Sequence, residues 1–311
     1  MNEVLKKLHD VPLTPKAACH TLDFSPNSDQ LVASTWNKFV HCWDVSTGER
    51  MWREKAHSGP VYAARFSPDG RFVVSCDAGK KYSECIVWSA SNGQIFNRFE
   101  IDAAAESFDV AISPDGKQYA FPYRDDEKCS LKVVSSDGKT LLHAIDHYEY
   151  PPEFVFFSPN SKSLYVFADS KLERWSTKTW KCAFTVKLMG GDVTCATHSS
   201  RPSLIYAGDR IKKCILVINP KNGDIESKLL QKAGDFTRGV RTIQIVSGKL
   251  LAGYSPGIIV RHSLKSSSNS IFEIDENEFE DEPLAIAANG IVAADVSDSR
   301  LRIWKCGPEN A

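Results

Sequence analysis

The chain has 311 residues, of which 42% are hydrophobic and 25% are charged, as in an ordinary soluble globular protein. With 38 basic and 39 acidic side chains its formal net charge is −1, so no overall field favours nucleic acid or an anionic membrane. The first twenty residues contain no apolar run of signal-peptide length, and no later stretch could span a bilayer. We expect an intracellular protein, cytoplasmic or nuclear, without a membrane partner.

The cysteines also favour an intracellular protein. Their number, nine, is odd, and five of them lie within strand-like runs rather than in paired loop positions. These five are Cys42, Cys85, Cys195, Cys214 and Cys306. We expect reduced thiols in the core.

Residues 3–9 alternate in character, but no turn-linked strand precedes them. The last stretch, 284–306, contains three strand-like runs where earlier stretches contain four. We expect 3–9 to pair with 301–306, because this pairing would complete the last sheet and cover an exposed strand edge.

The stretch 57–94 is the clearest copy of a unit that recurs. A loop histidine, His57, leads into the alternating run 61–66, and after a turn the chain returns through 71–76 and then 85–88. Alternation between turns rich in Gly, Pro, Asn and Asp predicts short, half-buried strands and no helix.

A fixed spacing connects this unit to the others. Trp88 is followed five residues later by the turn residue Gly93, and the equivalent position recurs at intervals of 45, 45, 42, 43, 44 and 42 residues. The matching positions are Trp43, Trp88, Val133, Trp175, Ile218, His262 and Trp304. This period predicts one repeat domain, 1–311, with seven units.

The units differ in how closely they follow the pattern. In chain order they cover 17–55, 57–94, 108–139, 153–175, 192–223, 240–264 and 284–306. The third has Val133 where tryptophan is expected, and the fifth and sixth are the loosest.

These residues resemble the WD-repeat (Trp-Asp repeat) family of β-propellers, and the resemblance extends over essentially the whole chain. It implies an all-β fold, a seven-bladed β-propeller with four-stranded antiparallel blades, closed by the N-terminal strand on the last blade. In this family a loop histidine, an aspartate between the second and third strands and a third-strand tryptophan form a structural hydrogen-bond network.

Carried over to this chain, the resemblance assigns His57, Ser75 and Trp88 of the second unit to this network. Asp169 and Asp298 lie six residues before a matching tryptophan, Asn37 replaces the aspartate in the first unit, and the second unit's aspartate stays unassigned because its turn is longer. The structural residues implied are His57, Ser75, Trp88, Trp43, Asp169, Trp175, Asp298 and Trp304.

Two short motifs match catalytic patterns but fit turns better. Residues 253–257 match G-x-S-x-G, yet 258–264 predict a strand instead of the required helix, and Pro256 lacks the backbone N–H. Residues 137–140 resemble the end of a phosphate-binding loop, but Val133 replaces its first glycine. The histidines are scattered without metal-ligand spacing. We expect no catalytic residue, no metal site and no cofactor.

Loops joining second to third strands, and loops joining successive units, should emerge on one rim of the ring, where a rigid scaffold would hold them. Aromatic and arginine side chains anchor protein interfaces, so we expect partner binding there. The candidates are Trp36, Tyr82, Tyr123, Arg124, Tyr148, Tyr150, Arg210, Lys212, Lys213, Phe236, Arg238 and Tyr254. A basic arc, 210–213 with Lys232 and Arg238, lies beside an acidic stretch, 273–282, and would orient a charged peptide.

We therefore expect a non-catalytic scaffold, monomeric by itself, that binds a protein or peptide on this rim and in the central funnel as a subunit or adaptor of a larger complex. Strand addition at a blade edge offers a second route. Two alternatives stay open: a propeller enzyme or metal-binding protein that uses the central channel, and nucleic-acid binding through the basic arc. The first strands supply few inward-facing His, Asp or Glu, and the net charge is near zero, so both rank lower; no small-molecule substrate is expected.

Overall fold

Every element in the described part of the chain is a β strand. The computed structural model describes residues 3–13, 19–77, 82–103, 106–107, 109–124, 128–188, 192–200, 203–230, 239–246, 249–254, 258–263, 269–273, 284–287, 289, 292–297 and 299–308. In chain order the strands are β1 (Glu3–Pro12), β2 (Cys19–Phe24), β3 (Gln30–Thr35), β4 (Val40–Asp44), β5 (Arg50–Glu54), β6 (Val61–Phe66), β7 (Phe72–Asp77), β8 (Tyr82–Ser89), β9 (Ile95–Ala103), β10 (Glu106–Ser107), β11 (Ala111–Ile112), β12 (Gln118–Arg124), β13 (Cys129–Ser135), β14 (Leu141–Tyr148), β15 (Phe154–Phe157), β16 (Ser163–Ala168), β17 (Lys171–Ser176), β18 (Cys182–Lys187), β19 (Val193–Ser200), β20 (Ser203–Asp209), β21 (Cys214–Ile218), β22 (Ile225–Leu230), β23 (Val240–Val246), β24 (Lys249–Tyr254), β25 (Ile258–Ser263), β26 (Asn269–Glu273), β27 (Leu284–Ile286), β28 (Val292–Ser297) and β29 (Arg300–Pro308). None of these residues forms a helix long and apolar enough to cross a membrane.

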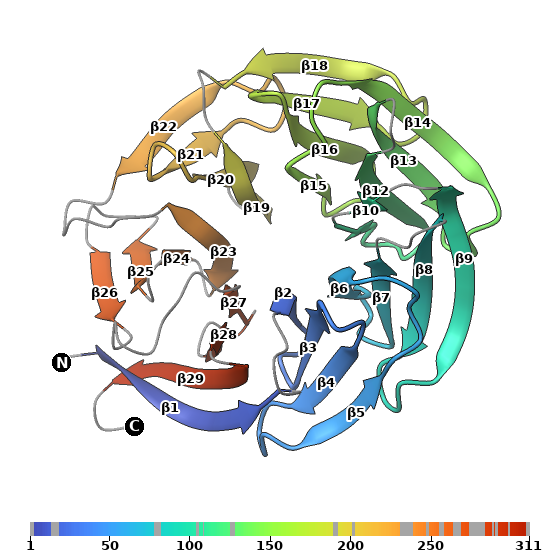
Figure 1. Cartoon of the computed structure of the whole chain (residues 1–311). Helices are drawn as coiled ribbons and strands as arrows, with labels where there is room; N and C mark the ends of the chain where they lie inside the picture. The colour runs from blue at the N-terminus through green and yellow to red at the C-terminus, as the bar shows by residue number, and fades with distance from the viewer. Residues whose placement is uncertain are drawn as a thin grey trace.

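The strands pair into small antiparallel sheets that stand around a central opening (Figure 1). Over the described residues, the hydrogen-bonded orders are β2-β3-β4-β5, β6-β7-β8-β9, β10-β12-β13-β14 with β11 also on β12, β15-β16-β17-β18, β19-β20-β21-β22, β23-β24-β25-β26 and β1-β29-β28-β27. We call these sheets blades one to seven in that order. The expected all-β propeller of four-stranded sheets is confirmed; blade three differs because both β10 and β11 pair with β12.

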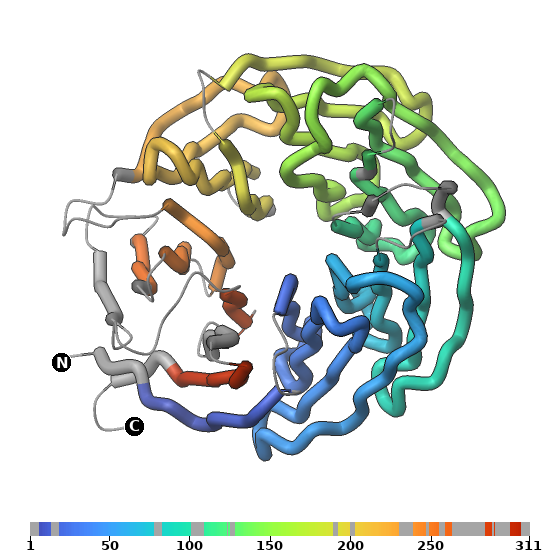
Figure 2. Tube along the Cα trace, viewed as in Figure 1, coloured from blue at the N-terminus to red at the C-terminus, as the bar shows by residue number. Residues whose placement is uncertain are grey.

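Strands from opposite ends of the sequence lie side by side, as the blue and red segments in Figure 2 show. β1 pairs antiparallel with β29, with Leu5 opposite Cys306 and Lys7 opposite Trp304. The expected pairing of 3–9 with 301–306 is therefore observed, with a bulge between Lys7 and His9. This pairing supplies the outermost strand of blade seven from the other end of the sequence.

Each buried cluster of the described residues joins two neighbouring blades. Because side chains alternate along a strand, one strand serves two interfaces. In β3, Leu31 packs in a cluster with Leu301 of blade seven, whereas the adjacent Val32 packs in a cluster with Trp88 of blade two. Stability is thus shared around the ring, because no blade buries its apolar residues alone.

The fixed spacing in the sequence marks the third strand of every blade. All seven matching positions, from Trp43 in β4 to Trp304 in β29, lie in third strands. The turn residues five positions later include Gly93, whose φ of 70° is left-handed. A Cβ there would lie 2.9 Å from the ring of Trp52, so both the φ angle and the space require glycine. Blade four places Trp180 at this position, with φ 51°.

We predict that Val11→Asp destabilises the protein by roughly 2 kcal/mol, because it places a charge against an apolar cluster. Val11 is a partly buried residue of β1 packed on the cluster shared by blades one and seven. Thermal unfolding followed by circular dichroism measures the effect. Leu8→Asp is the matched control, since Leu8 on the same strand is 38% exposed; equal midpoints for the two variants would contradict a role of β1 in closing the ring.

Candidate functional site

The loops of one rim are tied together by hydrogen bonds. The Asp169 carboxylate, between β16 and β17, accepts the backbone N–H groups of Glu149 and Tyr150, between β14 and β15, both at 3.1 Å. Arg210 donates to Asp192 in the same way in blade five, at 2.8 Å. In blades four and five, loops between second and third strands therefore contact the loops that enter the blade, as the sequence predicts for a common rim.

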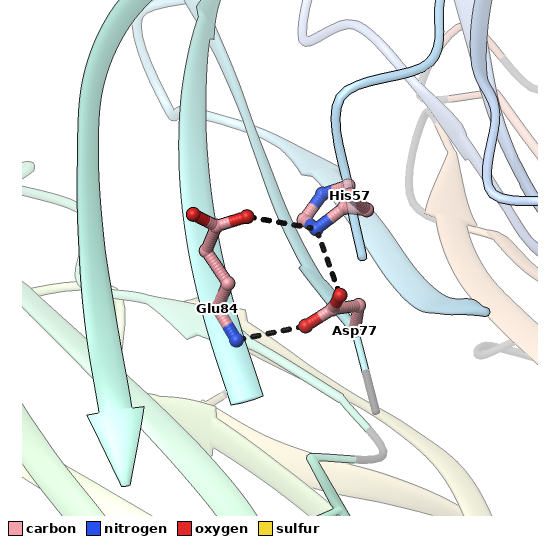
Figure 3. Close-up of side chains that lie close together, drawn as sticks. All are labelled: His57, Asp77 and Glu84. Carbon is pink, nitrogen blue, oxygen red and sulfur yellow. Dashed lines mark hydrogen bonds and ion pairs between the residues drawn. The ribbon is translucent and has the colours of Figure 1, made fainter. Parts of the chain in front are cut away.

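Blade two contains the complete network that the resemblance implies only in part. Trp88 Nε1 donates to Ser75 Oγ at 2.7 Å, and His57 Nε2 lies 2.7 Å from the same oxygen. His57 Nδ1 faces Asp77 Oδ2 at 3.5 Å, as Figure 3 shows. Asp77 is thus the missing aspartate. It also accepts the N–H of Gly59 at 2.8 Å, which fixes the loop entering the blade.

Two buried carboxylates share the edge of the His57 ring (Figure 3). Burial raises the pKa of Asp77, but the neighbouring His57 and the N–H groups of Glu84 and Gly59 together outweigh burial and leave this pKa below its usual value. Burial raises the pKa of Glu84 above its usual value, although the nearby Arg98 opposes it. The chain therefore holds Asp77 ionised beside the imidazole.

The same three side chains could hold a divalent cation. One ligand atom each from His57, Asp77 and Glu84 lie within 4.8 Å of one another. Their partners within the protein account for the arrangement without an ion, however. Asp77 accepts the N–H groups of Gly59 and Glu84, each at 2.8 Å, and Glu84 lies 3.3 Å from Arg98 Nε.

Blade four builds a different network around its tryptophan. Trp175 Nε1 donates to Glu173 Oε2 at 2.9 Å, and Tyr148 OH donates to the same oxygen at 3.0 Å. Glu173 is opposite Val166 in the strand pair, where blade two has Ile86 opposite Ser75. The acceptor for the indole has therefore moved across the strand pair, from the second strand to the third.

Of the other residues predicted to have structural roles, two are buried tryptophans and one lies outside the described residues. Trp43 and Trp304 are buried, and the ring of His41 stacks on Trp43 at 5.2 Å. His262, in the place of a tryptophan, is 3% exposed, in agreement with a core-filling role. Asp298 lies outside the described residues.

Two residues that the sequence predicts to bind a partner at the surface are buried, so this prediction is wrong for them. Tyr148 is 7% exposed and bonded to Glu173, and Tyr254 is fully buried at the end of β24. The sequence predicts both on exposed loops because they lie close to predicted turns. Here the strands extend further, and both rings pack in clusters between blades.

The remaining partner-binding candidates that the structure describes differ in exposure. Trp36 is 49% exposed, Tyr150 is 63% exposed, and Arg124, Arg210 and Lys213 are exposed, whereas Lys212 is half-buried. Arg210 is paired with Asp192, so it is less available to a partner than expected. Tyr82 and Tyr123 lie in β8 and β12, with side chains outside the described part, and Phe236 and Arg238 are outside it altogether.

Paired strands flank both of the short catalytic-looking motifs. Gly138 N–H donates to Ser135 O at 2.8 Å between β13 and β14, which confirms a β-turn. Tyr254 is directly opposite Ile258 in the pairing of β24 with β25, so a strand, not a helix, follows the G-x-S-x-G motif. Ser255, Pro256 and Gly257 lie outside the described residues.

A cavity of about 640 Å³ occupies the centre of the ring and is lined mainly by first strands. Its wall carries more charge than the sequence suggests, with Asp23, Arg65, Asp109 and Arg241. Arg65 donates to Asp109 at 3.3 Å and to the Leu22 carbonyl at 3.2 Å, and these contacts join blades one, two and three. Burial raises the pKa of Asp23 to about 6, against the opposing charge of Arg65.

A family model for the WD domain, G-beta repeat (WD40), matches residues 10–44 and 48–92. The match covers β2 to β5 of blade one and most of blade two. The chain therefore contains WD40 repeats, and the resemblance found in the sequence is confirmed.

Several curated proteins are similar to parts of the chain. Transcription initiation factor TFIID subunit 5 of Caenorhabditis elegans is 26% identical over 124 residues, which are 40% of this chain and 18% of that protein. Small ribosomal subunit protein RACK1y of Oryza sativa subsp. japonica is 28% identical over 158 residues, 49% of this chain and 46% of that protein. Serine-threonine kinase receptor-associated protein of Rattus norvegicus is 23% identical over 128 residues, 41% of this chain and 34% of that protein. Each match spans less than half of the relative's length.

We predict that Ser75→Ala lowers the free energy of unfolding by about 1–3 kcal/mol, because Trp88 Nε1 and His57 Nε2 lose their shared buried partner. Urea denaturation measures this loss. Ser91→Ala is the control, since Ser91 lies on the exposed turn of the same blade. Equal stabilities of the two variants would show that the network contributes nothing.

We predict that Asp23→Asn raises the melting temperature at pH 8 and leaves it nearly unchanged at pH 4. The folded pKa of about 6 exceeds the ordinary 3.8, so the folded state binds the proton more strongly and the carboxyl group's contribution to stability is lost as pH rises from about 4 to 6. Calorimetry from pH 4 to 8 tests this. Asp146→Asn, at an exposed ion pair with Lys128, should change little at any pH; a lower melting temperature of Asp23→Asn at pH 8 would contradict the prediction.

Proposed function

We propose that this protein is a non-catalytic scaffold that binds a protein or peptide on its loop rim and central funnel. The observation that carries the proposal is the exposure of large side chains on loops that hydrogen bonds hold in place. Trp36 is 49% exposed and Tyr150 is 63% exposed. The backbone at Tyr150 is fixed by Asp169. Rigid, exposed aromatic side chains contribute contact area at a small entropic cost.

The architecture supports this role. The seven sheets of the described residues, with an apolar cluster between each neighbouring pair, support a seven-bladed ring closed by β1. Such a ring presents many loops on one rim without moving its strands. The charged groups of the central cavity bond to one another and to backbone groups of neighbouring blades, so we assign them to holding the first strands together rather than to catalysis.

The relatives support a place in an assembly. Their names describe a subunit of a transcription initiation factor, a protein of the small ribosomal subunit and a protein associated with a serine-threonine kinase receptor. We propose, by this likeness, a subunit or adaptor of a larger intracellular complex, in the cytoplasm or nucleus, that is monomeric when purified alone.

Proteins that co-purify in stoichiometric amounts with the wild-type chain from its native cells should be lost from the double variant Trp36→Ala with Tyr150→Ala. Each truncation at an interface anchor costs roughly 1–2 kcal/mol or more of binding free energy. Affinity purification with quantitative mass spectrometry measures companions against bait. The matched control is Phe96→Ala with Leu141→Ala, since these residues are 71% and 55% exposed at the starts of outer strands, away from the rim loops. Companions retained by the rim variant and lost by the control would overturn the rim assignment.

A further inference from the structure

One sector of the rim combines an exposed aromatic ring with cations that form no ion pair among the described residues. We call it the blade-one strip and define it as Trp36, Lys38, Phe39, Arg53 and Lys55. It is built from the loop between β3 and β4 and from the end of β5. The two segments are 14 or more residues apart in sequence, and strand pairing across β4 brings them together.

The inner end of the strip is an aromatic ledge beside the central cavity. The Trp36 ring lies 4.5 Å from the ring of His20 and 5.6 Å from that of Tyr62, measured between centroids. His20 lines the cavity, and burial lowers its pKa to about 4, so the imidazole is neutral at physiological pH. The indole is therefore supported from below while about half of its surface stays exposed.

The outer end of the strip gathers positive charge around one ring. The Arg53 guanidinium lies 4.9 Å and the Lys55 ammonium 5.3 Å from the centroid of Phe39. Lys38 Nζ donates to the carbonyl of Ser58 at 2.5 Å. Among the described residues, none of these three cations forms an ion pair with a carboxylate. Glu54 lies between Arg53 and Lys55 in sequence, on the opposite face of its strand.

The strip is held in place at a conformational cost. Lys38 has a φ of 75°, a left-handed conformation that strains a lysine and suits glycine. Its turn is closed by hydrogen bonds of Thr35 with Lys38 and Phe39, both at 3.1 Å. Its ammonium contacts Ser58, the neighbour of Gly59, whose N–H is bonded to Asp77. The network of blade two therefore also fixes one cation of the strip.

The positive charge of the strip also acts on a buried histidine of the same blade. His41, directly opposite Arg53 in the pairing of β4 with β5, has its pKa lowered to about 3, first by burial and then by Arg50 and Arg53. A surface whose cations form no ion pair among the described residues attracts negative charge.

We infer that the blade-one strip binds an acidic peptide segment of the partner, with its carboxylates on Lys38, Arg53 and Lys55 and an apolar side chain on Trp36. This inference rests on the proposed rim-binding function and names the chemistry of its partner. Charge complementarity selects the acidic occupant, and the ledge selects an apolar neighbour. Two cations over the Phe39 ring and a third on the neighbouring loop form a small patch, not the long basic track that a nucleic-acid backbone requires.

The test uses a fluorescein-labelled peptide with four repeats of Glu-Leu-Asp-Phe and a neutral version in which Gln and Asn replace Glu and Asp. We expect the acidic peptide to bind the wild-type chain at least about tenfold more tightly in polarisation assays at 0.15 M salt. Arg53→Gln with Lys55→Gln, and separately Trp36→Ala, should each weaken binding by about tenfold or more. Lys38→Gly removes the cation and relieves the backbone strain, so it should weaken peptide binding without lowering the melting temperature.

The matched control is Lys187→Gln, which removes an exposed cation from β18 in blade four and should leave binding unchanged. Equal binding of the two peptides, or full binding by the strip variants, overturns the inference. Tighter binding of an unstructured polyuridine RNA than of the acidic peptide also overturns it, in favour of nucleic acid. If the peptide assay fails while the companions are still lost on Trp36→Ala with Tyr150→Ala, the inference fails alone; if those companions are retained, the proposed function fails.

Discussion

The structure depends on one constraint: every blade must bury both of its faces against other blades. Alternate residues of a single strand, such as Leu31 and Val32, belong to clusters on opposite sides of the same sheet. A sheet with two apolar faces has no stable free surface, so the series of blades must return to its start. The pairing of β1 with β29 makes that return through backbone hydrogen bonds, because the last blade takes its outer strand from the first residues.

The hydrogen-bond network of blade two connects this packing to the rim. Ser75 and Trp88 lie in the sheet, whereas His57 and Gly59 lie in the loop before it, and Asp77 joins the two regions. Blade four achieves a similar result with a carboxylate, Glu173, in place of the hydroxyl. The requirement is therefore a buried acceptor for the indole N–H, which either the second strand or the tryptophan's own third strand can supply.

The period of the sequence predicts the blades and their third strands because these depend on local alternation and turn chemistry. The closing pair is predictable because the last unit lacks a fourth strand. The site is less predictable. Asp77 was missed because the turn after it is longer than in other units, although an aspartate at a strand end before a tryptophan strand is a usable signal. The burial of Tyr148 and Tyr254 depends on where strands end, which propensity locates poorly. The blade-one strip could not be predicted from the sequence, because strand pairing rather than closeness in sequence brings Arg53 to Phe39.

The pairing of β1 with β29 also has a consequence for synthesis. The partners Lys7 and Trp304 are separated by nearly the full chain, so β1 leaves the ribosome long before its partner strand exists. During that interval blade one exposes the apolar face that later meets Leu301 and Ile303. Contacts between residues so far apart in sequence slow folding. The nascent chain must reach about residue 308 before its ring can close.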